Sequence, residues 1–192
     1  MQLGFIGLGA MGLPMTRHLL EAGHQVTVAS RSPGSVERAV SLGAVDGGSA
    51  AGVGAAGEIV FLCVPSSPQV VEVVSAMLPT LGQGKVVVDC STIDPDVTRE
   101  QHALVTGTGA GFLDAPLSGG TAGAEAGTLT LMVGGEEATL ERVRPVLDAF
   151  AARIVHVGGP GMGQVVKLCN NLIYAAQMLA TAEARGTPTS TP

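Results

Sequence analysis

A glycine-rich turn near the start of the chain constrains the fold more than any other stretch. It consists of six residues in the pattern G-x-G-x-x-G: Gly7, Leu8, Gly9, Ala10, Met11 and Gly12. An apolar segment at residues 1–7 leads into the turn, and a helical pattern over about residues 10–22 follows it. Such glycines allow a tight turn, close approach of the backbone to a pyrophosphate, and close packing of the helix on the strand. The pattern predicts that these six residues bind a dinucleotide; the alternative is a structural glycine turn in an unrelated α/β domain.

Strand-like and helical patterns alternate along the rest of the chain. Apolar strand segments are expected at about residues 1–7, 25–29, 58–64, 85–90, 111–115, 129–133 and 154–157. Helices are expected at about residues 10–22, 33–42, 68–78, 95–105, 136–151 and 163–182. This alternation predicts an α/β fold with a doubly wound, Rossmann-type sheet.

The same patterns divide the chain into three parts. Residues 1–160 hold the alternating segments and form the expected dinucleotide-binding domain. Residues 161–184 follow a Gly/Pro loop and are expected to form one long helix. Residues 185–192, with the sequence RGTPTSTP, show no apolar periodicity and are expected to be a disordered tail.

Charge and composition exclude several classes of partner. The net charge is −6 and no basic run occurs, which argues against a nucleic-acid or anionic-membrane surface. Cys63, Cys90 and Cys169 lie in apolar segments without close spacing, which indicates reduced, buried thiols. No apolar run is long enough to span a membrane, and the first residues lack the pattern of a signal peptide. We therefore expect a cytoplasmic protein, and no metal site is predicted.

The end of the second expected strand carries a base where dinucleotide sites usually carry an acid. An Asp or Glu about 20 residues after the glycine turn normally bonds the ribose 2′-hydroxyl, but no acid occurs between Glu21 and Glu37. Arg31 lies there between Ser30 and Ser32, and a guanidinium flanked by two hydroxyls suits a 2′-phosphate. The sequence favours NADP over NAD; the alternative is a solvated loop arginine.

A lysine and an amide share one face of the last expected helix. Lys167 and Asn171 are four residues apart, so both project from the same side of a helix. Such a pair beside a sheet can be a small catalytic set or an ordinary polar surface patch. The other motifs of the chain favour the catalytic set.

Four stretches together resemble the β-hydroxyacid dehydrogenase family, which includes 3-hydroxyisobutyrate dehydrogenases, tartronate semialdehyde reductases and glyoxylate/succinic semialdehyde reductases. They are GFIGLGAMGLPM (4–15), DCSTIDP (89–95), DAPLSGGTAGAEAGTLTLMVGG (114–135) and GPGMGQVVKLCNN (159–171). The resemblance implies hydride transfer between a nicotinamide cofactor and a small hydroxyacid or semialdehyde. It also implies that the long helix is the first of an all-α domain, and that most of this domain is missing from the sequence.

The resemblance assigns roles to five residues in the second half of the chain. Lys167 matches the catalytic lysine, and Asn171 matches a substrate-binding amide. Ser118, Gly119 and Gly120 match the segment that binds the substrate carboxylate, and a hydroxyl with exposed backbone N–H groups suits that role. For these three residues the alternative is a plain turn between strand and helix.

Three further residues follow the ends of expected strands. Val64 and Pro65 come after the third strand and Thr92 after the fourth, at the edge where open α/β sheets bind ligands. In the family, the matching positions line the nicotinamide ring and its ribose. We therefore count all three as cofactor-binding residues.

Departures from related families narrow the expected function. 6-Phosphogluconate dehydrogenases carry a histidine and an acid where this chain has Gln164 and Tyr174, so decarboxylation is not expected. Imine reductases usually replace the lysine that Lys167 matches. The sequence thus predicts an NADP-dependent oxidoreductase acting on a small carboxylate, with a truncated dinucleotide-binding module of little turnover as the alternative.

The apolar face of the helix at 163–182 predicts a homodimer or other self-association.

Overall fold

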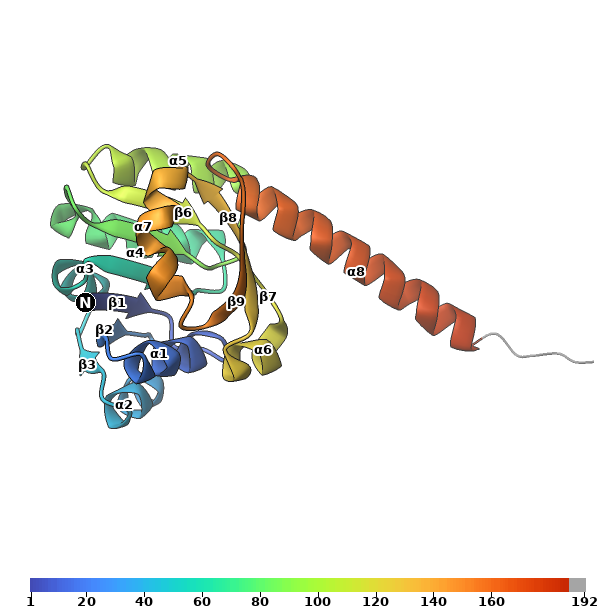
Figure 1. The fold of residues 1–192 in the computed structure, drawn as a ribbon, viewed down its shortest axis with the longest axis horizontal. Helices are drawn as coiled ribbons and strands as arrows, with labels where there is room; N and C mark the ends of the chain where they lie inside the picture. The colour runs from blue at the N-terminus through green and yellow to red at the C-terminus, as the bar shows by residue number, and fades with distance from the viewer. Residues whose placement is uncertain (187–192) are drawn as a thin grey trace, which may run out of the picture.

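The computed structural model describes residues 1–186 and contains a nine-stranded sheet with helices on both faces (Figure 1). The strands are β1 Gln2–Ile6, β2 Gln25–Ala29, β3 Val45–Asp46, β4 Ile59–Leu62, β5 Val86–Asp89, β6 Gly111–Asp114, β7 Leu117–Ser118, β8 Leu129–Gly135 and β9 Ala151–Gly158. Their spatial order is β3-β2-β1-β4-β5-β6-β8-β7, and β9 pairs with β8. The first six strands are parallel, whereas β8 runs antiparallel to β6 and β7. The predicted doubly wound, Rossmann-type α/β fold is confirmed.

The helices cover the sheet in two layers that follow from its apolar strands. They are α1 Gly12–Glu21, α2 Pro33–Ser41, α3 Ala50–Ala56, α4 Ser67–Met77, α5 Pro95–Thr106, α6 Gly120–Ala126, α7 Glu137–Leu147 and α8 Met162–Gly186, with a 3-10 turn at Leu78–Thr80. Buried side chains of α1, α2, α6 and α7 join one core, and those of α3, α4 and α5 join the other. Strands β4 and β5 are buried along their full length, as expected for parallel strands covered on both faces.

Three short elements, β3, α3 and β7, were missed from the sequence, and one helix was predicted too long. β3 has only two residues, and α3 has the sequence AAGVGAA, whose small side chains give no amphipathic pattern. The helix expected at 136–151 ends at Leu147 instead. Phe150 is fully buried and extends the apolar pattern, but Ala151 already pairs with Leu129 as the start of β9. Sheet pairing therefore overrides the helical periodicity at these residues.

Helix α8 leaves the sheet and projects from the body of the molecule (Figure 1). Every residue from Leu168 to Arg185 is exposed. Cys169 is among them, so the prediction of three buried cysteines is wrong for this one; Cys63 is partly buried and Cys90 is buried. The helix also includes Arg185 and Gly186, which the sequence had placed in a disordered tail; the rest of that tail lies outside the described residues. Among residues 1–186, no helix combines the length and hydropathy needed to cross a membrane.

Candidate functional site

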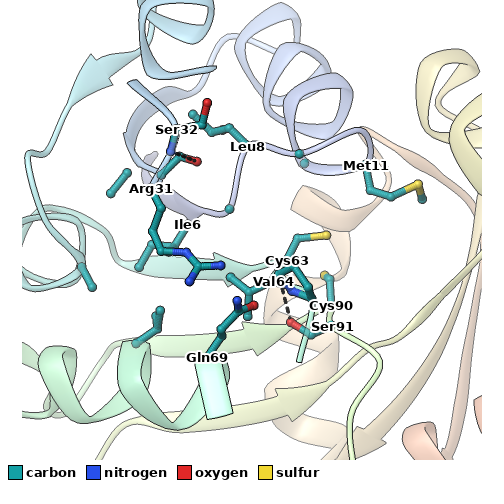
Figure 2. A pocket seen from close by; sticks show the side chains of 18 of the residues that line it. Ile6, Leu8, Met11, Arg31, Ser32, Cys63, Val64, Gln69, Cys90 and Ser91 are labelled. Carbon is teal, nitrogen blue, oxygen red and sulfur yellow. Dashed lines mark hydrogen bonds between the residues drawn. The ribbon is translucent and has the colours of Figure 1, made fainter. Parts of the chain in front are cut away.

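A cavity of about 790 Å³ opens at the carboxyl ends of β1, β2, β4 and β5 (Figure 2). The strand order reverses direction between β1 and β4, and open α/β sheets bind ligands at such a point. All the residues predicted to bind the cofactor line this cavity: Gly7, Leu8, Gly9, Ala10, Met11, Gly12, Ser30, Arg31, Ser32, Val64, Pro65 and Thr92. The fold thus brings four separate stretches of the sequence, at 7–12, 30–32, 64–65 and 92, to one place.

The three glycines of the turn have different surroundings. Gly7 has a φ of +100°, and a Cβ there would lie 2.2 Å from the carbonyl oxygen of Cys63. A Cβ on Gly12 would lie 1.9 Å from the carbonyl oxygen of Gly7, where α1 packs on the turn. A Cβ on Gly9 would meet no atom within 4 Å, and Gly9 lines the cavity. Binding a dinucleotide pyrophosphate needs a tight turn, close packing of the helix on that turn, and open space through which the phosphates can reach the backbone. The turn has all three features and therefore fits this group.

Arg31 extends across one end of the cavity toward α4 (Figure 2). With its side-chain oxygen turned toward the guanidinium, Gln69 of α4 accepts hydrogen bonds from Arg31. Glu72, one helical turn further along α4, lines the same cavity. Sequence reasoning missed both α4 residues. The available signal was their three-residue spacing on the helix that follows β4.

Ser91 connects the loop after β4 to the loop after β5. Its Oγ accepts a hydrogen bond from the N–H of Val64 at 3.0 Å (Figure 2), and its N–H donates to Oδ1 of Asp89 at 2.9 Å. Asp89 is fully buried, and this burial raises its pKa to about 7; hydrogen bonds from Ser91 act in the opposite direction. Oδ2 of Asp89 has no hydrogen-bond partner among the described residues. A buried carboxyl group therefore lies directly beneath the cavity-lining loops.

Helix α8 begins against a second buried carboxylate. Asp114, the last residue of β6, accepts hydrogen bonds from the N–H groups of Gly161 at 2.8 Å and Gln164 at 3.1 Å. A Cβ on Gly163 would lie 2.7 Å from Oδ2 of Asp114, so the helix can approach this closely only with glycine there. Burial raises the pKa of Asp114, while the backbone N–H groups lower it. These contacts fix the start of α8 at the edge of the sheet.

Lys167 lies in the second turn of α8 and lines the cavity. Its side chain is partly buried, and this burial lowers the pKa of the ammonium group. Among the described residues, no carboxylate forms an ion pair with Lys167. The cavity therefore combines a turn that fits a dinucleotide with an amine suited to proton exchange.

Comparison with known proteins agrees with this geometry. Residues 2–158 match the family model described as the NAD binding domain of 6-phosphogluconate dehydrogenase. The 2-hydroxy-3-oxopropionate reductase of Escherichia coli is 44% identical over 96% of this chain, and the NAD-dependent L-serine dehydrogenase of Pseudomonas aeruginosa is 42% identical over 95%. The chain belongs to the β-hydroxyacid dehydrogenase family.

A solved structure of this dehydrogenase family has nearly the same fold. The 3-hydroxyisobutyrate dehydrogenase of Mycobacterium tuberculosis, solved with L-serine, superposes with a TM-score of 0.93 at 40% identity over 96% of this chain. The chain spans 64% of the length of the E. coli reductase, 62% of the P. aeruginosa dehydrogenase and 64% of the solved structure. The shared part thus comprises the sheet, its helices and α8.

The predicted substrate-binding residues are grouped less closely than the predicted cofactor-binding residues. Gly120 lines the cavity, whereas the two residues before it, Ser118 and Gly119, do not line the cavity. Gly119 and Gly120 have φ values of +129° and +61°, which favour glycine. Asn171 is exposed and does not line the cavity, although it lies one turn beyond Lys167. Within residues 1–186, no cluster of His, Cys, Asp and Glu side chains could hold a metal ion.

Proposed function

We propose that this chain is an NADP-dependent oxidoreductase that interconverts a small β-hydroxyacid and its semialdehyde or oxo acid by hydride transfer. Lys167 is the proposed general acid and base. The observation that carries the proposal is a single cavity lined by the glycine turn, Arg31, Thr92 and Lys167. One elongated ligand can therefore contact the 2′-phosphate site at one end and the amine at the other.

The cofactor would be held by residues from four strand ends. The backbone of the glycine turn would bind the pyrophosphate. Ser30, Arg31 and Ser32 would bind the 2′-phosphate, and Val64, Pro65 and Thr92 would line the nicotinamide and its ribose. When bound, the nicotinamide supplies or accepts the hydride. Glu72 also lines the cavity, but it comes from α4 and not from the end of β2, where the acid of NAD sites normally lies.

Lys167 would move the proton that accompanies the hydride. In the reducing direction its ammonium donates a proton to the alkoxide as it forms, and in the oxidising direction the neutral amine accepts the hydroxyl proton. Both directions need a lysine that exchanges protons readily near neutral pH. Burial lowers the pKa of Lys167, which shifts this residue toward that range.

The proposed substrate is a small carboxylate with an oxygen on its β carbon. The relatives are named for L-serine, 2-hydroxy-3-oxopropionate and 3-hydroxyisobutyrate, which share these groups. Ser118, Gly119 and Gly120 would bind the carboxylate through the hydroxyl and the backbone N–H groups. Asn171 would bond the carboxylate or the hydroxyl.

A substrate panel tests the proposal. L-serine and 3-hydroxyisobutyrate are offered with NADP, and glyoxylate, 2-hydroxy-3-oxopropionate and other small semialdehydes with NADPH, while NADPH absorbance is followed. We expect turnover of at least one member, and a loss of about 10²- to 10⁴-fold in Lys167→Ala with NADPH affinity retained. Equal turnover by Lys167→Ala and the unmodified chain would refute the role of Lys167.

A second candidate function is cofactor binding with little turnover. It is favoured by the exposure of α8 from Leu168 onward, because a site open to water stabilises charge poorly during hydride transfer. The comparison protein is the full-length E. coli reductase. A rate close to that of the reductase rules out this second candidate, whereas tight NADPH binding without turnover supports it.

We also propose self-association through α8. Leu172 and Leu179 are 72% and 68% exposed, and Ile173, Tyr174 and Met178 are exposed beside them. Large apolar side chains that are exposed over two turns of one helix favour burial against another surface. Analytical ultracentrifugation should show dimers or larger species, which Leu172→Glu with Leu179→Glu should dissociate; a monomer at high concentration would contradict the proposal.

A further inference from the structure

Gln164 joins helix α8 to both sides of Thr92. The side chain is fully buried. Its Oε1 accepts a hydrogen bond from the N–H of Ile93 at 3.1 Å, and its Nε2 donates to the carbonyl oxygen of Ser91 at 2.8 Å. Because Ser91 and Ile93 flank Thr92, one glutamine side chain fixes the backbone of the loop that lines the cavity after β5.

Ser91 extends this connection to the next strand end. Its side chain accepts the hydrogen bond from the N–H of Val64, which lines the cavity after β4 (Figure 2). Hydrogen bonds therefore run without interruption from α8 through Gln164 and Ser91 to Val64. The two loops and the helix that line the proposed nicotinamide end of the cavity are linked by buried polar contacts.

Gln164 and Asp114 fix different properties of α8. Asp114 accepts hydrogen bonds from backbone N–H groups at the first turn, which fixes the position of the helix end. Backbone N–H groups lie close to the helix axis, whereas the end of a side chain lies further from it. Contacts to the backbone therefore resist rotation about the axis less than contacts to a side chain do. Gln164 projects from one side of α8, and Lys167 lies three residues further along on neighbouring positions of that side. The glutamine contacts therefore act on the side of α8 that carries Lys167.

We infer that Gln164 is a positioning residue: its two hydrogen bonds to the Thr92 loop set the rotation of α8, so that Lys167 faces the cavity. The inference rests on the proposed role of Lys167 as the proton-exchanging group. A glutamine that only satisfied its own buried polar atoms would contribute to stability and would leave the surroundings of Lys167 unchanged. The two cases differ in what happens to Lys167 when the hydrogen bonds are removed.

The chain contains two lysines, Lys85 and Lys167, so ¹³Cε-lysine labelling gives two NMR signals that can be titrated separately. Lys85→Arg assigns them. The test variants are Gln164→Ala and Gln164→Met; methionine fills a similar volume without hydrogen bonds and guards against a failure to fold. The matched control is Gln101→Ala, because Gln101 is a buried glutamine of α5 that does not line the cavity.

We expect the pKa of Lys167 to rise toward the ordinary lysine value in both Gln164 variants, since a rotated helix returns the ammonium to solvent. NADPH affinity, measured by fluorescence titration, should fall in the same variants because the Thr92 loop is released. Gln101→Ala should lower the melting temperature without moving the Lys167 signal. An unchanged pKa of Lys167 in Gln164→Met, or an equal rise in Gln101→Ala, overturns the inference. The titration needs no turnover, so an inactive chain would count against the proposed function alone.

Discussion

Gly9 and Gly12 belong to the same turn, yet their surroundings predict opposite effects of adding one methyl group. In Gly9→Ala the new Cβ enters open cavity space, so stability should stay within about 0.5 kcal/mol of the unmodified chain. NADPH affinity should fall, because the methyl group occupies space needed by the pyrophosphate. In Gly12→Ala the Cβ meets the carbonyl oxygen of Gly7, and overpacking should cost about 1–3 kcal/mol.

Urea unfolding and NADPH titration of both glycine variants separate the two effects. The proposed site requires that Gly9→Ala loses cofactor affinity while it keeps its unfolding midpoint. Unchanged NADPH affinity in this variant would show that the pyrophosphate does not lie on the turn.

Arg31 is the residue on which the choice between NADP and NAD depends. Arg31→Asp replaces a charge-assisted hydrogen-bond donor with a carboxylate that repels a 2′-phosphate. NADPH affinity should fall by about 10- to 100-fold, and NADH affinity should be retained or improved. Arg153→Asp makes the same charge change at an exposed position outside the cavity and is the control. Equal losses in the two variants would point to net charge and not to a 2′-phosphate site.

At the scale of helices and strands, the features that were predicted correctly from the sequence are those that depend on the local pattern of residues. The glycine turn, the apolar strands and the base at the end of β2 are local signals, and the cavity residues that they predicted lie together. Gln69 and Glu72 were missed because the docking of α4 decides which of its residues face the cavity. Asn171 shares a helix face with Lys167, but one turn adds about 5.4 Å along the axis. This rise carries it beyond the cavity, a consequence of where α8 leaves the sheet.

The hydrogen bonds at the start of α8 predict the effect of replacing one oxygen of Asp114 with nitrogen. In Asp114→Asn one of the two accepting oxygens becomes an NH₂ donor, so the N–H of Gly161 or of Gln164 loses its partner. An unsatisfied buried group costs about 1–3 kcal/mol, and urea unfolding should show a loss of this size. Hydrogen exchange should accelerate in the first turn of α8 before it does so in β4 or β5. Asp148→Asn, at the exposed C-cap of α7, is the control; equal exchange in both variants would contradict an anchoring role for Asp114.

For the whole molecule, two buried carboxyl groups lie side by side at the edge of the sheet where the cavity opens. Asp89 of β5 and Asp114 of β6 are paired in register, and both are fully buried. Asp114 is compensated by the N–H groups of α8, whereas Asp89 keeps an oxygen without a partner among the described residues. A fold that is otherwise stabilised by apolar burial thus contains one acid at its centre that is only partly compensated by hydrogen bonds. This acid makes the stability of the whole domain depend on pH.

The direction of that dependence follows from the pKa of Asp89, which burial raises to about 7 in the folded chain from an ordinary value of 3.8. Between these two values the unfolded chain has released the proton and the folded chain still holds it. The free energy of unfolding therefore falls as pH rises through this window, by at most about 1.4 kcal/mol per pH unit, and levels off above it.

Asp89→Asn removes this contribution, and its asparagine oxygen can still accept the N–H of Ser91. Its stability relative to the unmodified chain should accordingly be greater at about pH 8 than at about pH 6 in urea unfolding. Glu37→Gln, an exposed charge change on α2, controls for net charge; parallel pH profiles for the unmodified chain and Asp89→Asn would show that Asp89 is ionised throughout.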